Sequence, residues 1–448
     1  MDEDEVRDLS KRYEEVVDWL FGLHRYGSRP GLVNIRHLLD CMGDPHEGFK
    51  SIHVTGTNGK GTTTAMTASI LKAAGYSVGM FTSPHLSSFT ERIVVNGRRI
   101  PPEDVVRIVD EIRPHINEMV ENTELRHPTF FEVITAIAFK YFSEQRVDFA
   151  VLEVGMGGKL DATNVVHALV SVITNVSLEH THVLGSTVLE IAEKKAGVVK
   201  EGGVLVTATQ DDAVYTLFKE TCEKVGSKIF RVGEDITFKR LESSLDGQNF
   251  RLEGLSEDYE DLTIPLIGRH QLLNAATAVG AVQALKLDGI DIPRDAVKAG
   301  LRKVVWPGRM EVMQTRPLVL LDGAKDAEAA RGIKETLLEE FPDRRRIAVV
   351  SVSSDKNIPE MIRHFSQATD YFIVTAHRVM GRAAKASVIT EQIVEYSKPY
   401  EVEPDVRRAV NRAKKIAGED GMVIVVGSVF LVGEAREIWF EPETPDPV

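Results

Sequence analysis

The segment at residues 51–64, SIHVTGTNGKGTTT, limits the possible fold of this chain more than any other stretch. An apolar run typical of a short buried strand leads into a glycine-rich turn, and a helical pattern follows directly. Glycines let backbone N–H groups approach phosphate oxygens, and a helix start adds unpaired donors. A lysine and neighbouring hydroxyl groups complete a site suited to a nucleoside triphosphate and Mg²⁺. The residues predicted to contact the nucleotide here are Gly56, Thr57, Asn58, Gly59, Lys60, Gly61 and Thr62.

This turn is shorter than the usual P-loop. The usual pattern has a longer spacer before its Gly-Lys pair, whereas only Thr57 and Asn58 follow Gly56 here, and Gly61 precedes the hydroxyl groups. The alternative is a plain glycine turn with a solvated Lys60. We favour phosphate binding, because the strand, the lysine and the hydroxyl groups all fall where that mechanism needs them.

Length and charge narrow the class of protein. With 448 residues the chain exceeds a comfortable single core, so about two or three domains are expected. The net charge of −13 argues against a general nucleic-acid binder and does not favour an anionic membrane surface. An acidic protein that handles an anionic substrate must concentrate its positive charge locally.

The sequence also bears on location. The two cysteines, Cys41 and Cys222, give neither a disulfide framework nor a metal pair, which fits a reducing compartment. The acidic first ten residues lack the apolar core of a signal peptide, and no apolar run approaches the length of a membrane span. We therefore expect a cytoplasmic monomer that binds neither nucleic acid nor membrane.

Strand and helix patterns alternate through much of the chain. This alternation predicts an α/β fold with a mostly parallel sheet covered on both faces. Ligands of such sheets bind beyond the carboxyl ends of the strands. Gly56, Ser83, Glu153 and Asn175 each lie at a predicted strand end, so we expect them to gather in one place.

Two changes of pattern divide the chain. Residues 227–265 become short and polar and resemble antiparallel strands, and Pro307-Gly308 makes a sharp break that is typical of a linker. Further strands alternate with helices beyond that break, at residues 318–322, 347–352, 371–375 and 422–426. The predicted units are a P-loop-type N-terminal domain, a linker and a smaller Rossmann-like α/β domain, at residues 1–304, 305–310 and 311–448.

Two clusters offer metal ligands. Glu153 ends a buried strand before a glycine run, and its carboxylate suits Mg²⁺, which prefers hard oxygens; the alternative is a carboxylate that caps backbone donors. The run Glu179-His180-Thr181-His182 has no zinc spacing. Residue type alone therefore favours surface or structural histidines there.

Two further clusters offer cations. Lys194 and Lys195 are adjacent on a predicted helix and point roughly 100° apart, so they cannot both face one site, and such pairs are usually solvated. The second of these clusters is split across the predicted linker, with Arg309 in PGRME and Asp322-Gly323-Ala324-Lys325 at a predicted strand end. A guanidinium suits phosphate and an Asp can hold ribose hydroxyls, although the alternative is an interdomain ion pair.

Taken together, these motifs resemble the folylpolyglutamate synthase/dihydrofolate synthase family, within the Mur-ligase superfamily of ATP-dependent amide-forming enzymes. The resemblance covers residues 31–436 and implies the Mur-ligase architecture. Its most specific parts are FTSPH with ERI, and LEVGMGGKLDATN. The other segments in family order are GTNGKGT, ITNVSLEHTHVLG, IAEKKAGVVK, GRHQLLNA, PGRME, LDGA and VVGSVFLVGEARE.

The resemblance implies two Mg²⁺ sites, one at Ser83 and Glu153 and one at Glu153 and His180. The family carries a carbamylated lysine in its EKAG motif, and the matching residue is Lys195. A carbamate replaces a cation with an anion and could support the second metal. The catalytic residues implied are therefore Lys60, Glu153, His180 and Lys195.

For the nucleotide, the resemblance implies that Lys60 and the loop amides hold the β- and γ-phosphates of ATP. Arg309 would contact the phosphates, and Asn274 and Asp322 the nucleoside. The family usually has LDGAHN where this chain has LDGAKD. Lys325 thus replaces a histidine and remains a candidate donor to phosphate.

The implied activity is that of an ATP-dependent acid–amino-acid ligase. ATP would phosphorylate a carboxylate of a folate or of dihydropteroate, and the amine of L-glutamate would attack the acyl phosphate to give an amide, ADP and phosphate. Closure of the C-terminal domain would exclude water from the acyl phosphate.

Two alternatives stay open. One is a sister amide ligase for another pterin or a tetrapyrrole-type carboxylate, because LDGAKD and the loop SRPGLVNIRHLL depart from the family pattern. The other is a P-loop NTPase that works as a switch. That class would leave FTSPH, KKAG and PGR together unexplained.

Overall fold

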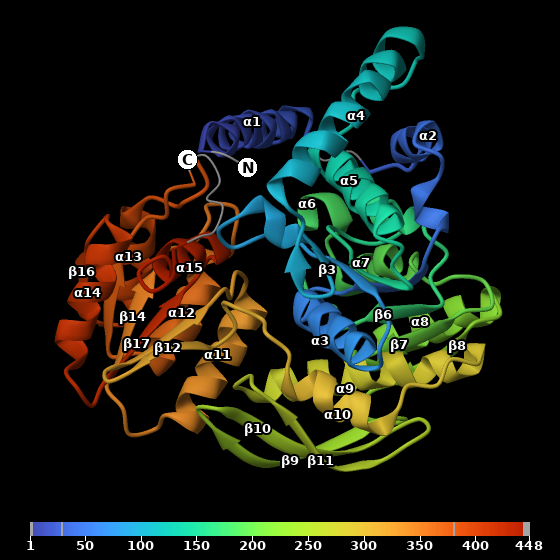
Figure 1. The fold of residues 1–448 in the computed structure, drawn as a ribbon. Helices are drawn as coiled ribbons and strands as arrows, with labels where there is room; N and C mark the ends of the chain where they lie inside the picture. The colour runs from blue at the N-terminus through green and yellow to red at the C-terminus, as the bar shows by residue number, and fades with distance from the viewer. Residues whose placement is uncertain (1–2, 28–29, 380, 442–448) are drawn as a thin grey trace.

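The computed structural model describes residues 3–27, 30–379 and 381–441. Figure 1 shows an N-terminal part in blue to green beside a C-terminal part in orange and red, with a small sheet below them. The described strands form one eight-stranded, one three-stranded and one six-stranded sheet. The predicted α/β class is confirmed.

The eight-stranded sheet has the order β4-β3-β2-β5-β1-β6-β7-β8. Strands β2, β5, β1, β6, β7 and β8 pair in parallel, while β3 and β4 form an antiparallel hairpin, as the two-residue turn Asn96-Gly97 between them favours. The strands are β1 (Lys50–Thr55), β2 (Val78–Phe81), β3 (Ile93–Val95), β4 (Arg98–Arg99), β5 (Phe149–Glu153), β6 (Val170–Ile173), β7 (Val204–Thr207) and β8 (Lys228–Arg231).

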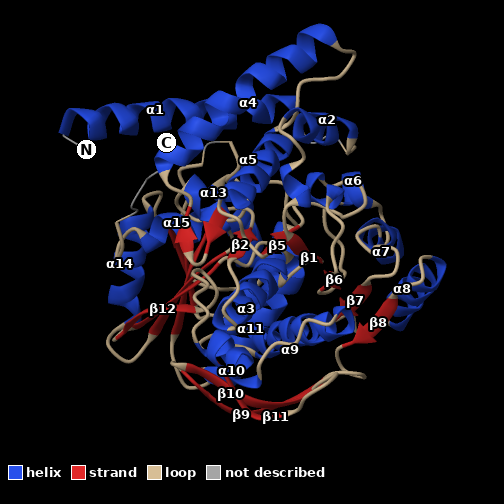
Figure 2. Cartoon of the chain, turned by 45° about the vertical axis from the view of Figure 1, so that its right-hand side comes forward, coloured by secondary structure: helices blue, strands red, loops and turns tan. Residues whose placement is uncertain are grey.

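Helices cover both faces of this sheet (Figure 2). Alternate residues of β5 show this arrangement, because Phe149 and Val151 pack into the core beneath α3, α9 and α10, whereas Ala150 and Leu152 pack with α4 and α5. A strand buried on both faces reads as one continuous apolar run. The helices of this part are α1 (Glu3–Gly22), α2 (Val33–Cys41), α3 (Lys60–Ala73), α4 (Pro102–Asn122), α5 (Phe130–Glu144), α6 (Thr181–Leu184), α7 (Val188–Ala196), α8 (Asp212–Lys224), α9 (Arg269–Ala284) and α10 (Arg294–Arg302).

The small sheet packs on α9 and α10 and consists of β9 (Thr237–Ser244), β10 (Gly247–Glu253) and β11 (Tyr259–Ile264). All three strands pair antiparallel, as predicted. The prediction was wrong for β8, which joins the large sheet in parallel with β7. β8 is an edge strand with polar residues, Lys228 and Arg231, at its two ends and half-buried residues between them. The same pattern is typical of a strand in a solvent-facing hairpin, which is why the sequence led to the wrong sheet.

The C-terminal sheet has the order β12-β13-β17-β14-β15-β16 and apolar cores on both faces. The four predicted strands are present, and the short edge strands β12 and β16 were missed because little of either is buried. The strands are β12 (Glu311–Thr315), β13 (Leu318–Asp322), β14 (Arg346–Val350), β15 (Tyr371–Val374), β16 (Tyr400–Val402) and β17 (Met422–Val426). The helices are α11 (Ala327–Glu340), α12 (Ile358–Ala368), α13 (Ala386–Glu395), α14 (Val406–Ala417) and α15 (Val429–Arg436).

Short 3₁₀ turns join several of these elements, namely η1 (Leu23–Tyr26), η2 (Pro45–Glu47), η3 (Phe89–Arg92), η4 (Ala162–Val165) and η5 (Leu285–Asp288). Among the helices that the structure describes, none is both long and apolar enough to cross a membrane.

Candidate active site

The glycine-rich turn lies between β1 and α3, where two glycines are required by close packing. Gly56 has φ +143°, and a Cβ atom on it would lie 1.9 Å from Oγ1 of Thr174. Gly59 has φ +82°, and a Cβ atom there would lie 2.2 Å from Oδ1 of Asn274 on α9. The structure thus places Asn274, predicted from a distant motif, directly against the turn.

The end of β6 holds this turn in place. The N–H of Thr57 donates to the carbonyl of Asn175 at 2.9 Å, and the N–H of Asn58 donates to its Oδ1 at 2.7 Å. Thr174 Oγ1 donates to the carbonyl of Asn58 at 2.6 Å. Since α3 begins at Lys60, the first N–H groups of that helix have no acceptor within the helix and can serve phosphate oxygens.

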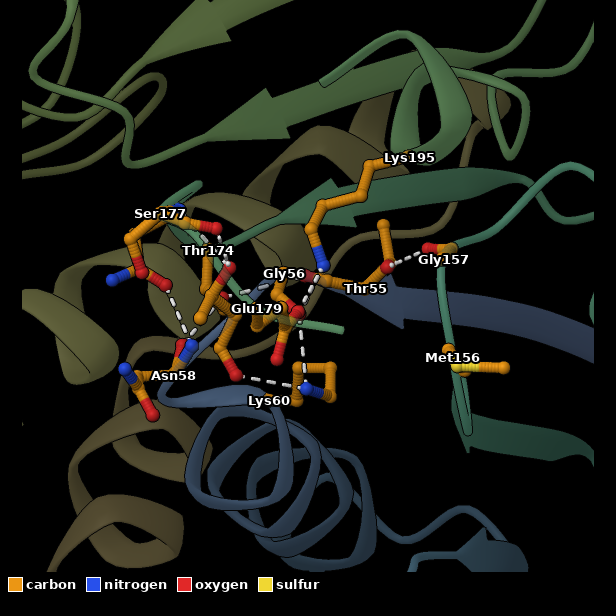
Figure 3. A network of polar contacts seen from close by, with 12 residues as sticks. Thr55, Gly56, Asn58, Lys60, Met156, Gly157, Thr174, Ser177, Glu179 and Lys195 are labelled. Atoms are coloured by element: carbon orange, nitrogen blue, oxygen red, sulfur yellow. Dashed lines mark hydrogen bonds and ion pairs between the residues drawn. The ribbon is translucent and has the colours of Figure 1, made fainter. Parts of the chain in front are cut away.

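Two lysines converge on the carbonyl of Gly56 (Figure 3). Lys60 Nζ donates to it at 2.9 Å and also to the carbonyl of Thr57 at 2.9 Å. Lys195 Nζ reaches the Gly56 carbonyl at 2.7 Å from α7 and forms an ion pair with Oε1 of Glu179 at 2.6 Å. Positive charge therefore gathers at the turn, as an anionic substrate requires.

Burial and charge set the protonation of this cluster. Burial lowers the pKa of Lys195 to about 8, although the carboxylate of Glu179 opposes that shift. Burial alone would raise the pKa of Glu179, but the ammonium groups of Lys60 and Lys195 outweigh it and hold that pKa at about 2. Glu179 is therefore an anion at neutral pH.

The two lysines of α7 differ as the helix geometry requires. Lys195 is 0% exposed, whereas Lys194 is exposed to solvent. They do not face one site, which confirms that prediction. The alternative of a solvated face is wrong for Lys195, because its side chain is buried. Its ammonium group is compensated by the ion pair with Glu179.

Glu153 lies at the carboxyl end of β5, next to β1, and its Oε2 accepts the N–H of Ser83 at 2.9 Å. Burial raises the pKa of Glu153, while the charge of Lys60 and the N–H of Ser83 oppose the rise. A desolvated carboxylate beside a hydroxyl-bearing residue fits Mg²⁺, which takes one or two carboxylates and completes its shell with phosphates and waters. The described residues contain no group of three or more His, Cys, Asp or Glu side chains fit for a metal, so a cage made only of such side chains is not present there.

His180 follows Glu179 and is the N-cap residue of α6, with φ +45°. Burial lowers its pKa to about 4 even though Glu179 opposes that shift, so its ring is neutral at pH 7 and can offer a nitrogen lone pair. The charges of Lys356 and Lys325 in the C-terminal part also lower the pKa of this ring. His182 is exposed.

The C-terminal sheet contributes residues at the end of β13. Asp322 accepts the N–H of Met310 at 2.9 Å and that of Ala324 at 2.8 Å, so both of its oxygens brace the backbone of the site. Arg309 Nη1 donates to the carbonyl of Gly308 at 2.8 Å. Burial lowers the pKa of Lys325, and the charge of Lys60 lowers it further.

Two contacts of the turn were not predicted. Asn58 Nδ2 donates to Oδ1 of Asp326 at 3.1 Å, and Asp326 also caps α11 through the N–H of Ala329 at 2.9 Å. A Cβ atom on Gly61 would lie 2.7 Å from Cζ2 of Trp306, so the extra glycine makes room for this indole. The extra Gly61, which departs from the P-loop pattern, was the only sign in the sequence of a close contact at this position. Nothing in the sequence identified Trp306 as the residue in contact.

Comparison with known proteins gives consistent matches. Residues 54–282 match the Mur ligase middle domain, and residues 308–429 match the Mur ligase, glutamate ligase domain. The chain is similar to the dihydrofolate synthase/folylpolyglutamate synthase of Bacillus subtilis, with 35% identity over 95% of this chain and 98% of that protein.

Solved structures extend these matches to the fold. Folylpolyglutamate synthase of Mycobacterium tuberculosis, complexed with ADP and AMPPCP, superposes with a TM-score of 0.90, with 31% identity over 97% of this chain and 100% of that one. FolC of Escherichia coli, in complex with DHPP and ADP, gives a TM-score of 0.84, with 27% identity over 94% and 97% of the two chains.

Proposed function

The chain belongs to the folylpolyglutamate synthase/dihydrofolate synthase family of Mur ligases, and from that premise we propose which of its residues carry out each part of the reaction. It is an ATP-dependent ligase that joins L-glutamate to a folate-type carboxylate and releases ADP and phosphate. The observation that carries the assignment of roles is the meeting of Lys60, Lys195 and Glu179 at the glycine-rich turn.

The turn and Lys60 hold the phosphates of ATP in this proposal. The N–H groups at the start of α3 face the β- and γ-phosphates, and the Lys60 ammonium, now on the carbonyl of Gly56, moves to the γ-phosphate. Arg309 compensates charge on the same phosphoryl group from the C-terminal side. Charge compensation and alignment are the main contributions of proteins to phosphoryl transfer.

The reaction needs two steps at one position. A carboxylate oxygen of the acceptor attacks the γ-phosphorus, ADP leaves, and an acyl phosphate forms. The neutral amine of L-glutamate then attacks the acyl carbon, and phosphate departs from the tetrahedral intermediate as the amide forms. Because water would hydrolyse the acyl phosphate, the contact of Asn58 with Asp326 across the two parts supports a closed site at this stage.

Glu153 and Ser83 are the proposed ligands of one Mg²⁺, and Glu153 with His180 those of a second. Mg²⁺ bound there would supply charge neutralisation on the transferring phosphoryl group. The carboxylate of Glu153 is buried, and binding of a cation would favour its charged form. The ring of His180 is neutral at pH 7 and offers a nitrogen lone pair. Both groups therefore fit this role.

Lys195 is the proposed site of carbamylation. The neutral form of an amine attacks CO₂, and burial already lowers the pKa of Lys195 to about 8. The carbamate would place an anion beside the anionic Glu179, so a cation must lie between them. The second Mg²⁺, proposed at Glu153 and His180, would supply that charge.

The remaining roles follow from position. Asn274 at Gly59 and Asp322 near Arg309 border the proposed nucleoside site, with Lys325 toward the phosphates. We take residues 1–304 and 311–448 as two domains joined by the linker 305–310, which crosses from α10 to β12.

We also propose a monomer in the cytoplasm. Two cysteines without a disulfide, Cys41 and Cys222, support a reducing compartment.

The test is an acceptor panel. The protein is incubated with ATP, Mg²⁺ and L-glutamate together with dihydropteroate, tetrahydrofolate, other pterins or a tetrapyrrole carboxylate, and the products are weighed by mass spectrometry. We expect a glutamyl residue on a folate-type acceptor. Transfer to a non-folate acceptor alone would overturn the acceptor assignment, and ATP hydrolysis of equal rate without any acceptor would indicate an NTPase.

A further inference from the structure

A groove of about 400 Å³ lies between the two parts of the chain, beside the active site. Its floor is the side of α3 that carries Ala65 and Ala68, together with β2. The β3–β4 hairpin and residues 303–307 form its walls, and α15 of the C-terminal part lines one end. None of the roles proposed above uses this groove as a whole.

The inner end of the groove opens at the reacting centre. Thr82 and Pro84 line it, and they flank Ser83, whose N–H binds the carboxylate of Glu153. Trp306 also lines it and packs against Gly61 of the phosphate-binding turn. A ligand in the groove would therefore end one residue away from the proposed Mg²⁺ ligands.

The outer end of the groove is cationic. Lys72 and Lys303 line it and are exposed, and within the described residues neither forms an ion pair. Arg99 lies 3.7 Å from Glu91, a distance at which a surface pair contributes little. Such a cluster stands out in a chain with a net charge of −13.

The floor between these ends is apolar. From Ala65 to Lys72 the helix α3 rises roughly 10 Å, and the groove along it is lined by Ala68, Val78 and Met80. A matching ligand has a carboxylate at its inner end, methylene groups along the floor and further carboxylates at the outer end. A chain of glutamyl residues has this alternation, because each unit carries two methylene groups and one free carboxylate.

We propose that this groove binds the glutamyl tail of an acceptor that already carries glutamate, with its reactive carboxylate at the inner end. The proposal rests on the glutamate-ligase function above and adds to it a subsite for chain extension. Lys72 and Lys303 would bind carboxylates of earlier glutamyl residues. The carboxylates of an acceptor with one glutamate would not reach them.

The test reverses the two outer charges. Lys72→Glu combined with Lys303→Glu is compared with Lys219→Glu, an exposed lysine on α8 far from the groove in sequence, and circular dichroism checks each fold. KM is measured for ATP, for a monoglutamyl acceptor and for a triglutamyl acceptor. We expect KM for the triglutamyl acceptor to rise about tenfold and the other two constants to stay within about twofold of wild type.

Three outcomes would overturn the subsite. In the double variant, these are an equal rise of KM for both acceptors, a rise of KM for ATP alone, and an unchanged KM for the triglutamyl acceptor. A variant with Lys72→Arg and Lys303→Arg should bind the tail about as well as wild type, because it keeps both positive charges. If wild-type protein adds glutamate to no acceptor, the ligase function itself fails, and this proposal fails with it.

Discussion

The Nζ atom of Lys195 lies 2.6 Å from Oε1 of Glu179, and the two side chains are only 1% and 11% exposed. Burying the two charges of such an ion pair costs desolvation free energy. Removing one partner strongly destabilises the folded protein, because the other charge then stays buried without compensation. Its position on the carbonyl of Gly56 ties α7 to the phosphate-binding turn. The pair therefore links the group proposed for carbamylation to the loop proposed for ATP.

Carbamylation of Lys195 should depend on pH in a defined direction. Only the neutral amine attacks CO₂, and its fraction rises as the pH passes the pKa of about 8. We expect the carbamate, followed by NMR with carbon-13 bicarbonate, to increase from about pH 7 to about pH 9. Lys195→Ala should lose the signal and most of the activity, whereas Lys194→Ala, its exposed neighbour, should keep both. A fully active Lys195→Ala would exclude the proposal.

Lys60 should be needed for chemistry and dispensable for folding. Removing a charge aimed at the transferring phosphoryl group commonly costs about 100-fold or more in kcat. We expect Lys60→Ala to show such a loss with an unchanged circular dichroism spectrum, while Lys219→Ala stays near wild type. Retained turnover in Lys60→Ala would show that the turn does not bind the reacting phosphate.

Gly61 should tolerate no side chain while Trp306 is present. A Cβ atom there would lie 2.7 Å from the indole, and overpacking of this kind costs about 1–3 kcal/mol. We expect Gly61→Ala to weaken ATP binding, measured by calorimetry, and a second change, Trp306→Val, to restore part of it. Gly22→Ala is the matched control, because a Cβ atom at Gly22 meets nothing within 4 Å. Equal affinities for Gly61→Ala and wild type would refute the steric argument.

Asp326 should matter both for the stability of α11 and for the contact with Asn58. Asp326→Ala removes the cap of α11, which costs about 1 kcal/mol, and it also removes the acceptor of the Asn58 amide. Asp326→Asn keeps an oxygen for both contacts. We therefore expect urea unfolding and the KM for ATP to change in Asp326→Ala and to stay near wild type in Asp326→Asn. Identical behaviour of the two variants would argue against the contact.

Local pattern was enough to predict most of the scaffold. The apolar run of β5 and the Asn96-Gly97 turn gave elements close to those observed, because periodicity and turn chemistry act over a few residues. The strand-end rule also placed Gly56, Ser83 and Glu153 at one edge of the sheet, as the register of β1 with β5 shows.

Contacts between distant segments could not be predicted in this way. The partner of Lys195 is 16 residues away, and that of Asn58 is 268 residues away. Trp306 reaches Gly61 only because the chain crosses back after α10. Periodicity carries no information on such pairings, and the pattern of the short edge strand β16 was too exposed to be distinguished from a loop.

The most direct test of the account follows one oxygen atom. An acceptor whose reactive carboxylate is labelled with oxygen-18 is incubated with ATP, Mg²⁺ and L-glutamate, and the phosphate and the amide are weighed. Because the attacking carboxylate oxygen becomes the bridge of the acyl phosphate, we expect each phosphate to carry one labelled oxygen and each product to gain one glutamyl residue. Phosphate without the label, or phosphate released at the same rate without an acceptor, would contradict the account.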